Sequence, residues 1–263
     1  MTALLTAEFR KVTSLRYWWI LGIAPLLVGL FCGALTLPIA RQIEDGFGFG
    51  TSTGFAEAVA AAVGTSLSLA LVFLFAAVFG AVETGSEFQH RTVVPTFLTA
   101  RGRDGVIAAK LVTAAVVGML YCIITSLSSV VTLLLFGGGF DGEVFGAVGT
   151  VLGIGLVCTA LWSLIGAGLG LLTRSTTGSV LALCVWVPFG ELIVSLILHG
   201  LGLGGVAPYL PAQVTWYTLF SAATSPDEVV LEVAWPVAPL VLVLWTALLC
   251  GLGWWRTRTR DVV

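Results

Sequence analysis

The sequence predicts an all-α, polytopic membrane protein with six transmembrane helices. Hydrophobic residues make up 58% of the 263 residues and charged residues only 10%, whereas charged residues are about 25% of a typical soluble domain. The apolar residues form six runs, each long enough to cross a hydrocarbon core of about 30 Å at about 1.5 Å per helical residue. When these runs are taken as spans, eleven of the twelve Lys and Arg residues fall on one side.

The expected spans are residues 18–39, 58–82, 111–136, 144–172, 179–198 and 237–255. Arg41 is the one cation on the opposite side. Because Lys and Arg are enriched in cytoplasmic loops, we expect both termini to be cytoplasmic. The chain is then a multi-pass protein of the cell membrane, with a single transmembrane domain over residues 1–263.

Residues 1–16 precede the first span. Leu5, Phe9 and Val12 recur at i, i+4 and i+7, and charged residues lie between them. This spacing predicts an amphipathic helix in the inner headgroup layer. The alternative is a charged flank that forms no helix of its own.

The longest outer loop is expected between spans five and six, at residues 199–236. It contains two stretches, 209–223 and 226–234, that are separated by turn residues. The second stretch follows Ser225 with Pro226, Asp227 and Glu228, which is a capping-box spacing with proline at the first helical position. We expect short outer helices here, in part re-entrant and covered by other protein.

Pairs of glycines four residues apart occur in two spans. Gly29 and Gly33 in the first span are a candidate dimer seam, because this spacing lets helix backbones approach closely in lipid. In the fourth span, the pairs 149/153 and 166/170 are expected to serve packing within the chain.

Polar residues inside the spans are few. Glu191 is the one ionisable residue deep in a span. An acid at the centre of a span raises the free energy of membrane insertion by about 2.5–3.5 kcal/mol. Pro188 and Gly190 favour a kink beside it. Glu191 is either a pathway or gating residue, or a hydrogen-bonded contact between helices. Thr125 and Ser129 belong to a hydroxyl stripe that either lines a pathway or bonds back to its own helix.

Motifs of soluble chemistry are missing from the sequence. There is no phosphate-binding loop, no HExxH motif and no spacing of cysteines that suits a metal. No basic patch with interleaved aromatic residues points to nucleic acid. We therefore expect no catalytic residue, no metal site and no cofactor in this chain.

The segment from Glu83 to Lys110 is the most informative polar stretch. It begins with acids and ends with cations, and the apolar residues Phe97 and Leu98 lie between them. A solvated loop has little need for these apolar residues. The pattern predicts a short helix that docks into a groove of a cytosolic partner; the alternative is a helix on the membrane surface.

This segment resembles the cytoplasmic segment of ATP-binding-cassette (ABC) type-2 export permeases. In that family an acid precedes a Gly/Arg-Thr-x-x-x-Thr-x-Leu stretch, a basic turn, and an Ala-Lys pair that opens the third span. The N-terminal residues 7–16 and the basic tail 256–262 are also similar to the family. The matching residues of the segment are Glu83, Arg91, Thr92, Thr96, Leu98, Arg101, Arg103, Ala109 and Lys110.

The resemblance implies a permease subunit of an exporter, moving a hydrophobic or amphipathic substrate outward. It implies a second permease copy or a paralogue, and a separate ATPase subunit that holds ATP and Mg²⁺. Alternatives of another class are a proton-coupled secondary transporter that uses Glu191, and a non-transporting membrane scaffold or sensor. The residues expected to couple the chain to the ATPase are Glu83, Glu87, Arg91, Thr92, Thr96, Phe97, Leu98 and Arg101.

Overall fold

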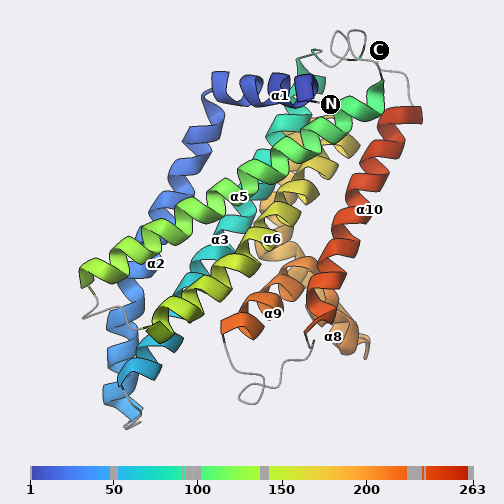
Figure 1. Ribbon diagram of the computed structural model, residues 1–263. Coiled ribbons are helices and arrows are strands. Elements are labelled where there is room, and N and C mark those ends of the chain that lie inside the picture. The colour runs from blue at the N-terminus through green and yellow to red at the C-terminus, as the bar shows by residue number, and fades with distance from the viewer. Residues whose placement is uncertain are drawn as a thin grey trace.

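The computed structural model is a bundle of long helices (Figure 1). It describes residues 2–47, 53–90, 92, 97, 102–136, 142–223, 233 and 235–259. Within these residues every regular element is a helix, which confirms the predicted all-α class. The start of the first helix and the end of the last lie at the same end of the bundle (Figure 1), which we call the terminal end.

Six helical segments are long and apolar enough to cross a membrane, as predicted. The fifth is composite, because a π-helical turn interrupts it at the position of Pro188. The six segments lie in α2 (Tyr17–Phe47), α3 (Thr53–Gln89), α5 (Arg103–Phe136), α6 (Gly142–Thr173), the series α7 (Thr176–Val185), η1 (Trp186–Gly190) and α8 (Glu191–Gly200), and α10 (Val237–Thr259).

Two of these helices extend further at the terminal end than the sequence indicated. The expected spans end at residue 82 and begin at residue 111, but α3 continues to Gln89 and α5 begins at Arg103. Glu83, Glu87 and Lys110 therefore lie on continuous helices and not in a connecting loop. The apolar pattern underestimated the helices because the last turns of α3 and the first turns of α5 contain charged residues that are buried against each other.

Close backbone contact between α3 and α6 forms the centre of the bundle. A Cβ atom on Gly166 would collide with the carbonyl of Ala77, and one on Gly80 would collide with the carbonyl of Ser163. This confirms packing within the chain for the 166/170 pair. Gly149 and Gly153 face open space instead, with no atom within 4 Å of an added Cβ among the described residues.

The first span packs against α5 of the same chain. Gly29 lies against Thr125 and Ser128, and Gly33 lies against Ser129, whose carbonyl is 2.9 Å from the position of an added Cβ. This corrects the expectation of a dimer seam at Gly29 and Gly33. The face that admits close approach is already occupied by another helix of the same chain.

The helices between spans five and six lie at the end of the bundle opposite the terminal end (Figure 1). They are η2 (Gly204–Tyr209) and α9 (Pro211–Ala223), and the latter confirms the helix expected at 209–223. Apart from Val233, the second stretch, 226–234, lies outside the described residues.

The fifth span is the least covered of the six. Only 11% of its apolar window is buried, compared with 67% in α3. Its exposed side chains are large and apolar, including Leu181, Val185, Leu192 and Leu196. In α8, Glu191 is the one buried residue.

Candidate functional site

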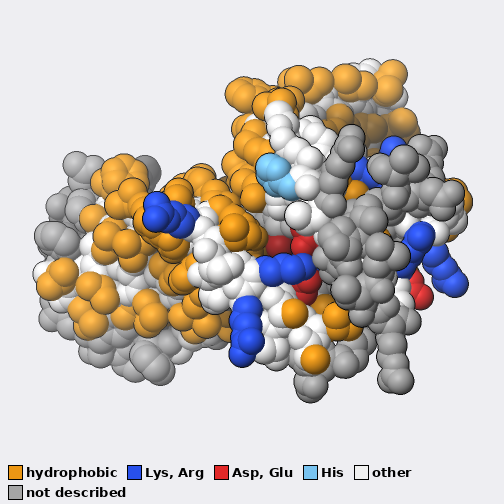
Figure 2. Space-filling model, turned by 90° about the horizontal axis from the view of Figure 1, so that it is seen from above, with side chains coloured by type: hydrophobic (Ala, Val, Ile, Leu, Met, Phe, Trp, Pro, Cys, Tyr) orange, Lys and Arg blue, Asp and Glu red, His pale blue; other side chains and the backbone are white. Residues whose placement is uncertain are grey.

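Five charged side chains from three helices meet at the terminal end. We call them the charge cluster: Glu8 and Lys11 of α1 (Thr2–Ser14), Glu83 and Glu87 of α3, and Lys110 of α5. Helix α1 lies across the end of the bundle (Figure 1) and contributes two of the five side chains. Seen onto this end, acidic side chains are visible between Lys and Arg side chains near the middle of the face (Figure 2).

Two lysines bridge two of the carboxylates. Lys110 Nζ lies 2.8 Å from Glu8 Oε2 and 2.6 Å from Glu87 Oε1. Lys11 Nζ lies 2.8 Å from Glu8 Oε1 and 3.0 Å from Glu87 Oε1. The four groups thus form a closed ring of ion pairs that connects α1, α3 and α5.

Burial makes these ion pairs strong determinants of where α1 lies. Glu8 and Lys110 are each 3% exposed. Removing one partner of a buried pair leaves the other charge uncompensated, which typically costs about 3–5 kcal/mol. Loss of one of these contacts should therefore destabilise the packing of α1 on the bundle.

The pKa values of the two residues that α1 contributes to the cluster are shifted in opposite directions. Burial alone raises the pKa of Glu8, but the charge of Lys110 and the hydrogen bonds from both lysines outweigh it, and the pKa lies below its ordinary value. Burial alone lowers the pKa of Lys11, but hydrogen bonds to Glu8 and Glu87 outweigh it and raise this pKa. Both residues are therefore charged at neutral pH.

Glu83 is different from the other carboxylates of the cluster. It is 4% exposed, and neither of its oxygens has a hydrogen-bond partner among the described residues. The Oε2 atom of Glu87, one turn further along α3, is likewise unpaired. The cluster thus contains three carboxylates and two ammonium groups. The ammonium groups pair with only two of the carboxylates, those of Glu8 and Glu87.

An apolar contact beneath the ring explains why α1 docks in this register. Val12 is buried together with Val72, Phe79 and Tyr121, one turn beyond Glu8 on the same face of α1. The buried face of α1 therefore carries an acid at i and an aliphatic residue at i+4. The expected apolar face of Leu5, Phe9 and Val12 included only part of this surface.

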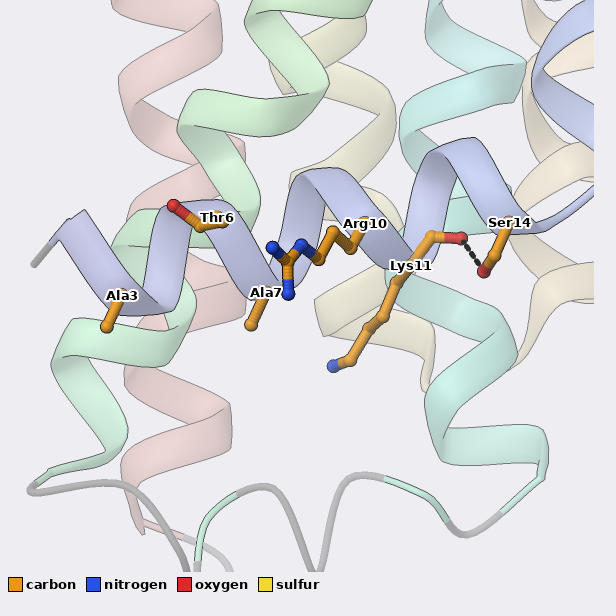
Figure 3. A pocket seen from close by; sticks show the side chains of 6 residues that line it. All are labelled: Ala3, Thr6, Ala7, Arg10, Lys11 and Ser14. Carbon is orange, nitrogen blue, oxygen red and sulfur yellow. Dashed lines mark hydrogen bonds between the residues drawn. The ribbon is translucent and has the colours of Figure 1, made fainter.

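The opposite side of α1 is open. Ala3, Thr6, Ala7, Arg10, Lys11 and Ser14 line a depression of about 830 Å³ (Figure 3). The Ser14 hydroxyl donates a hydrogen bond to the carbonyl of Lys11 at 2.8 Å, within the same helix.

The expected coupling residues fall into three groups. Glu83 and Glu87 belong to the charge cluster. Thr92 donates from its backbone N–H to the carbonyl of Glu87 at 3.0 Å, and the Arg103 guanidinium lies 5.8 Å from the centre of the Phe97 ring. The remaining four, Arg91, Thr96, Leu98 and Arg101, lie outside the described residues.

Arg174, between α6 and α7, ties two further helices together at this end. Its Nη2 donates to the carbonyl of Arg256 in α10 at 3.2 Å, and its guanidinium lies 5.6 Å from the centre of the Phe88 ring in α3. Sequence reasoning did not single out Arg174, because its partners are remote in the chain.

At the opposite end of the bundle, Glu191 caps a helix. Its carboxylate accepts hydrogen bonds from the backbone N–H of Ala212 at 2.8 Å and of Gln213 at 3.2 Å, in the first turn of α9. The positive end of the helix dipole favours an anion at this position. Glu191 is 2% exposed, so the structure supports a contact between helices over a pathway residue.

The hydroxyl stripe of α5 lies in the contact with α2. Thr125 donates to the carbonyl of Tyr121 at 2.8 Å, and Ser128 and Thr132 likewise donate to carbonyls of α5. Ser129 is 1% exposed. Thr125 and Ser129 therefore belong to a packed seam and do not line a pathway in this structure.

Comparison with known proteins supports the resemblance noted in the sequence. Residues 4–190 match the family described as ABC-2 family transporter protein. This range covers well over half of the chain and includes α1, the charge cluster and the first four spans. A search of curated proteins found no match.

Proposed function

The chain belongs to the ABC-2 transporter family, and from this premise we propose that it is the permease subunit of an ABC exporter. A separate ATPase subunit supplies ATP hydrolysis, with ATP and Mg²⁺ bound there, and this chain has no catalytic site. The substrate is hydrophobic or amphipathic and moves outward. Both termini, and therefore the charge cluster, face the cytoplasm.

The charge cluster is the observation that best supports this function. The segment expected to couple the chain to the ATPase, residues 83–103, runs from the end of α3 to the start of α5. Lys110 joins α5 to α3 through Glu87 at 2.6 Å and to α1 through Glu8 at 2.8 Å, and Glu87 joins α3 to α1 through Lys11 at 3.0 Å. A displacement of α3 or α5 at this end is therefore transmitted to the other two helices through short ionic contacts.

Coupling also requires a contact that differs between the two nucleotide states of the ATPase. The Phe97 ring and the Arg103 guanidinium, 5.8 Å apart, provide one apolar and one cationic group beside the start of α5. Such a pair suits a partner groove that is apolar with an acidic rim.

A second copy of the permease is expected to pack on the fifth span. Its outward apolar side chains are covered by nothing in the described part of this chain. A cysteine at Leu196, which is 65% exposed, should form a disulfide between copies, whereas one at Leu240 of α10, 63% exposed, should not. Equal cross-linking at both positions would place the contact elsewhere.

The proposal is tested by capture of the partner. The tagged chain is purified in mild detergent from its host, and its near-stoichiometric partners are identified by mass spectrometry. An ATPase subunit should be recovered with the wild type, and lost when Phe97 and Leu98 are both replaced by Asp. Thr259→Asp, an exposed change at the same end of the bundle, is the control and should retain the ATPase.

The outcomes separate this function from the other two candidates. Recovery of the chain alone, together with transport that needs only a proton gradient, would indicate a secondary transporter. Recovery of the chain alone without transport would indicate a scaffold or sensor. The capping role of Glu191 weakens the secondary transporter, because its carboxylate is already bonded to two backbone N–H groups.

A further inference from the structure

We propose that Glu83 holds a proton and that the charge cluster is a proton-binding site at the terminal end of the bundle. The proton binds to the carboxylate that no lysine reaches. The binding itself is a property of this chain alone. Its effect on transport rests on the function proposed above.

The first argument is the balance of charge. Five ionised side chains would give the cluster three negative and two positive charges, and so one uncompensated negative charge in a buried site. The charged groups that act on Glu83 are Glu8 and Lys11 from α1, Glu87 from α3 and Lys110 from α5. One bound proton makes the cluster neutral.

Among the described residues, the other helices packed on α3 supply no further compensating cation to Glu83. Helix α2 contributes Tyr17, a neutral side chain. Helix α7 contains no charged residue. The sequence of α6 contains no Lys or Arg.

The second argument is the geometry of the hydrogen bonds. Lys110 donates a hydrogen bond to Glu8 Oε2 at 2.8 Å and forms an ion pair with Glu87 Oε1 at 2.6 Å, and Lys11 donates to the other oxygen of Glu8 and to Glu87 Oε1. Both lysines are thus bonded to carboxylates other than Glu83. Within the part of the chain that the structure describes, both oxygens of Glu83 lack a hydrogen-bond partner.

The third argument is enclosure. Glu83 is 4% exposed, and each of its oxygens has less than 1 Å² of accessible surface. A lysine or arginine of a partner subunit cannot reach a carboxylate covered in this way. A buried carboxylate without a partner takes up a proton, because the neutral acid needs far less solvation than the anion. A proton also needs no additional space.

The consequence concerns α1. When the proton leaves, Glu83 becomes a third anion beside Glu8 and Glu87. Repulsion between them opposes the attraction of the two lysines for Glu8, which is the buried ionic contact of α1. Loss of the proton should therefore loosen α1 from α3 and α5, and so link the cytoplasmic pH to the helix that covers the coupling end.

The test uses the purified full-length chain in detergent, without any ATPase. Infrared spectra in H₂O and D₂O should show the carbonyl band of a protonated carboxylic acid that is lost in Glu83→Gln and kept in Glu87→Gln. Glu191 stays in place in both variants, so that any band of its own cancels in the comparison. Persistence of the full band in Glu83→Gln would overturn the proposal.

A second measurement follows stability with pH. More protons are bound in the folded than in the unfolded state if Glu83 is protonated, so the melting temperature of the wild type should fall as pH rises from about 6 to about 9. Glu83→Gln, which keeps the shape of the neutral acid, should be at least as stable as the wild type and lack this fall. Glu87→Gln, which weakens the acceptor of both lysines, should be less stable throughout.

Glu83→Met provides an apolar replacement of similar size if the amide of Gln is poorly accommodated. Stability of both variants well below that of the wild type, as for Glu87→Gln, would show that Glu83 is an ionised and paired residue. A wild-type stability that depends on Na⁺ at constant pH would assign the site to a metal cation and refute the proton. Neither result depends on whether an ATPase partner is captured.

Discussion

Replacement of Glu191 by Ala should release the first turn of α9 while the rest of the bundle stays folded. The Glu191 carboxylate is the one buried group of α8, and it accepts the N–H groups of Ala212 and Gln213 at 2.8 and 3.2 Å. Pro211, the first residue of α9, has no N–H to satisfy. The two bonds therefore satisfy the free donors at the start of this helix.

The magnitude follows from the loss of a helix cap. Replacing a good N-cap by Ala costs about 0.5–2 kcal/mol, and we take about 2 kcal/mol because the acceptor is a buried carboxylate that bonds two donors. Since 1.4 kcal/mol corresponds to a factor of ten, the ratio of docked to undocked α9 should fall roughly 30-fold. Glu191→Gln keeps one carbonyl acceptor and loses the interaction of a charge with the helix dipole, of about 0.3–1 kcal/mol, and should therefore cause a smaller change.

Hydrogen exchange followed by mass spectrometry measures this ratio directly, because the donors are backbone amides. Peptides that contain Ala212 and Gln213 should exchange roughly 30-fold faster in Glu191→Ala, while peptides from the centre of α6 stay protected as an internal control. Unchanged exchange at α9 together with lost transport would refute the capping role. It would instead make Glu191 a direct pathway or proton-carrying residue.

Three further predictions concern packing and charge, each checked by thermal unfolding of the purified chain. Gly166→Ala should destabilise the fold by about 1–3 kcal/mol, since its Cβ would meet the backbone of α3, whereas Gly153→Ala, facing open space, should be neutral or slightly stabilising. Because the pKa of Glu8 is lowered, its ion pairs stabilise the fold at neutral pH. This stabilisation should be lost as pH falls below about 4.3. The loss should be smaller in Lys110→Met, which already lacks one of the two ion pairs of Glu8. Trp162→Phe should cost about 1 kcal/mol, because the indole Nε1 donates a hydrogen bond at 2.9 Å to a threonine hydroxyl of α9; an unchanged melting temperature would contradict that role.

Much of the fold was predictable because membrane insertion depends on local composition. Runs of apolar residues and the distribution of Lys and Arg are properties of short segments, and they indicated six spans and the shared side of the two termini. The helix at 209–223 was likewise predictable, since turn residues and proline delimit it. The helix boundaries at the terminal end were predicted less accurately. Glu83, Glu87 and Lys110 are charged, and a hydropathy pattern assigns charged residues to a loop.

The site depended on contacts between residues far apart in the chain. Glu8 and Lys110 are separated by 102 positions and are 2.8 Å apart, and no local spacing indicates such a pair. The same reason applies to Gly29 and Gly33, whose spacing indicates close helix contact but not which helix makes it. Glu191 was recognisable as a costly acid within a span, but its partners belong to a helix that begins twenty residues later.

Composition and short-range pattern thus determine that this chain spans a membrane six times with both ends on one side, because the cost of placing each segment in lipid depends on that segment alone. The tertiary structure decides which helix faces meet, which charges compensate one another, and that Glu83 is left without a partner. These outcomes depend on the relative positions of whole helices, and a buried charge is stabilised or destabilised only by the groups that packing brings beside it.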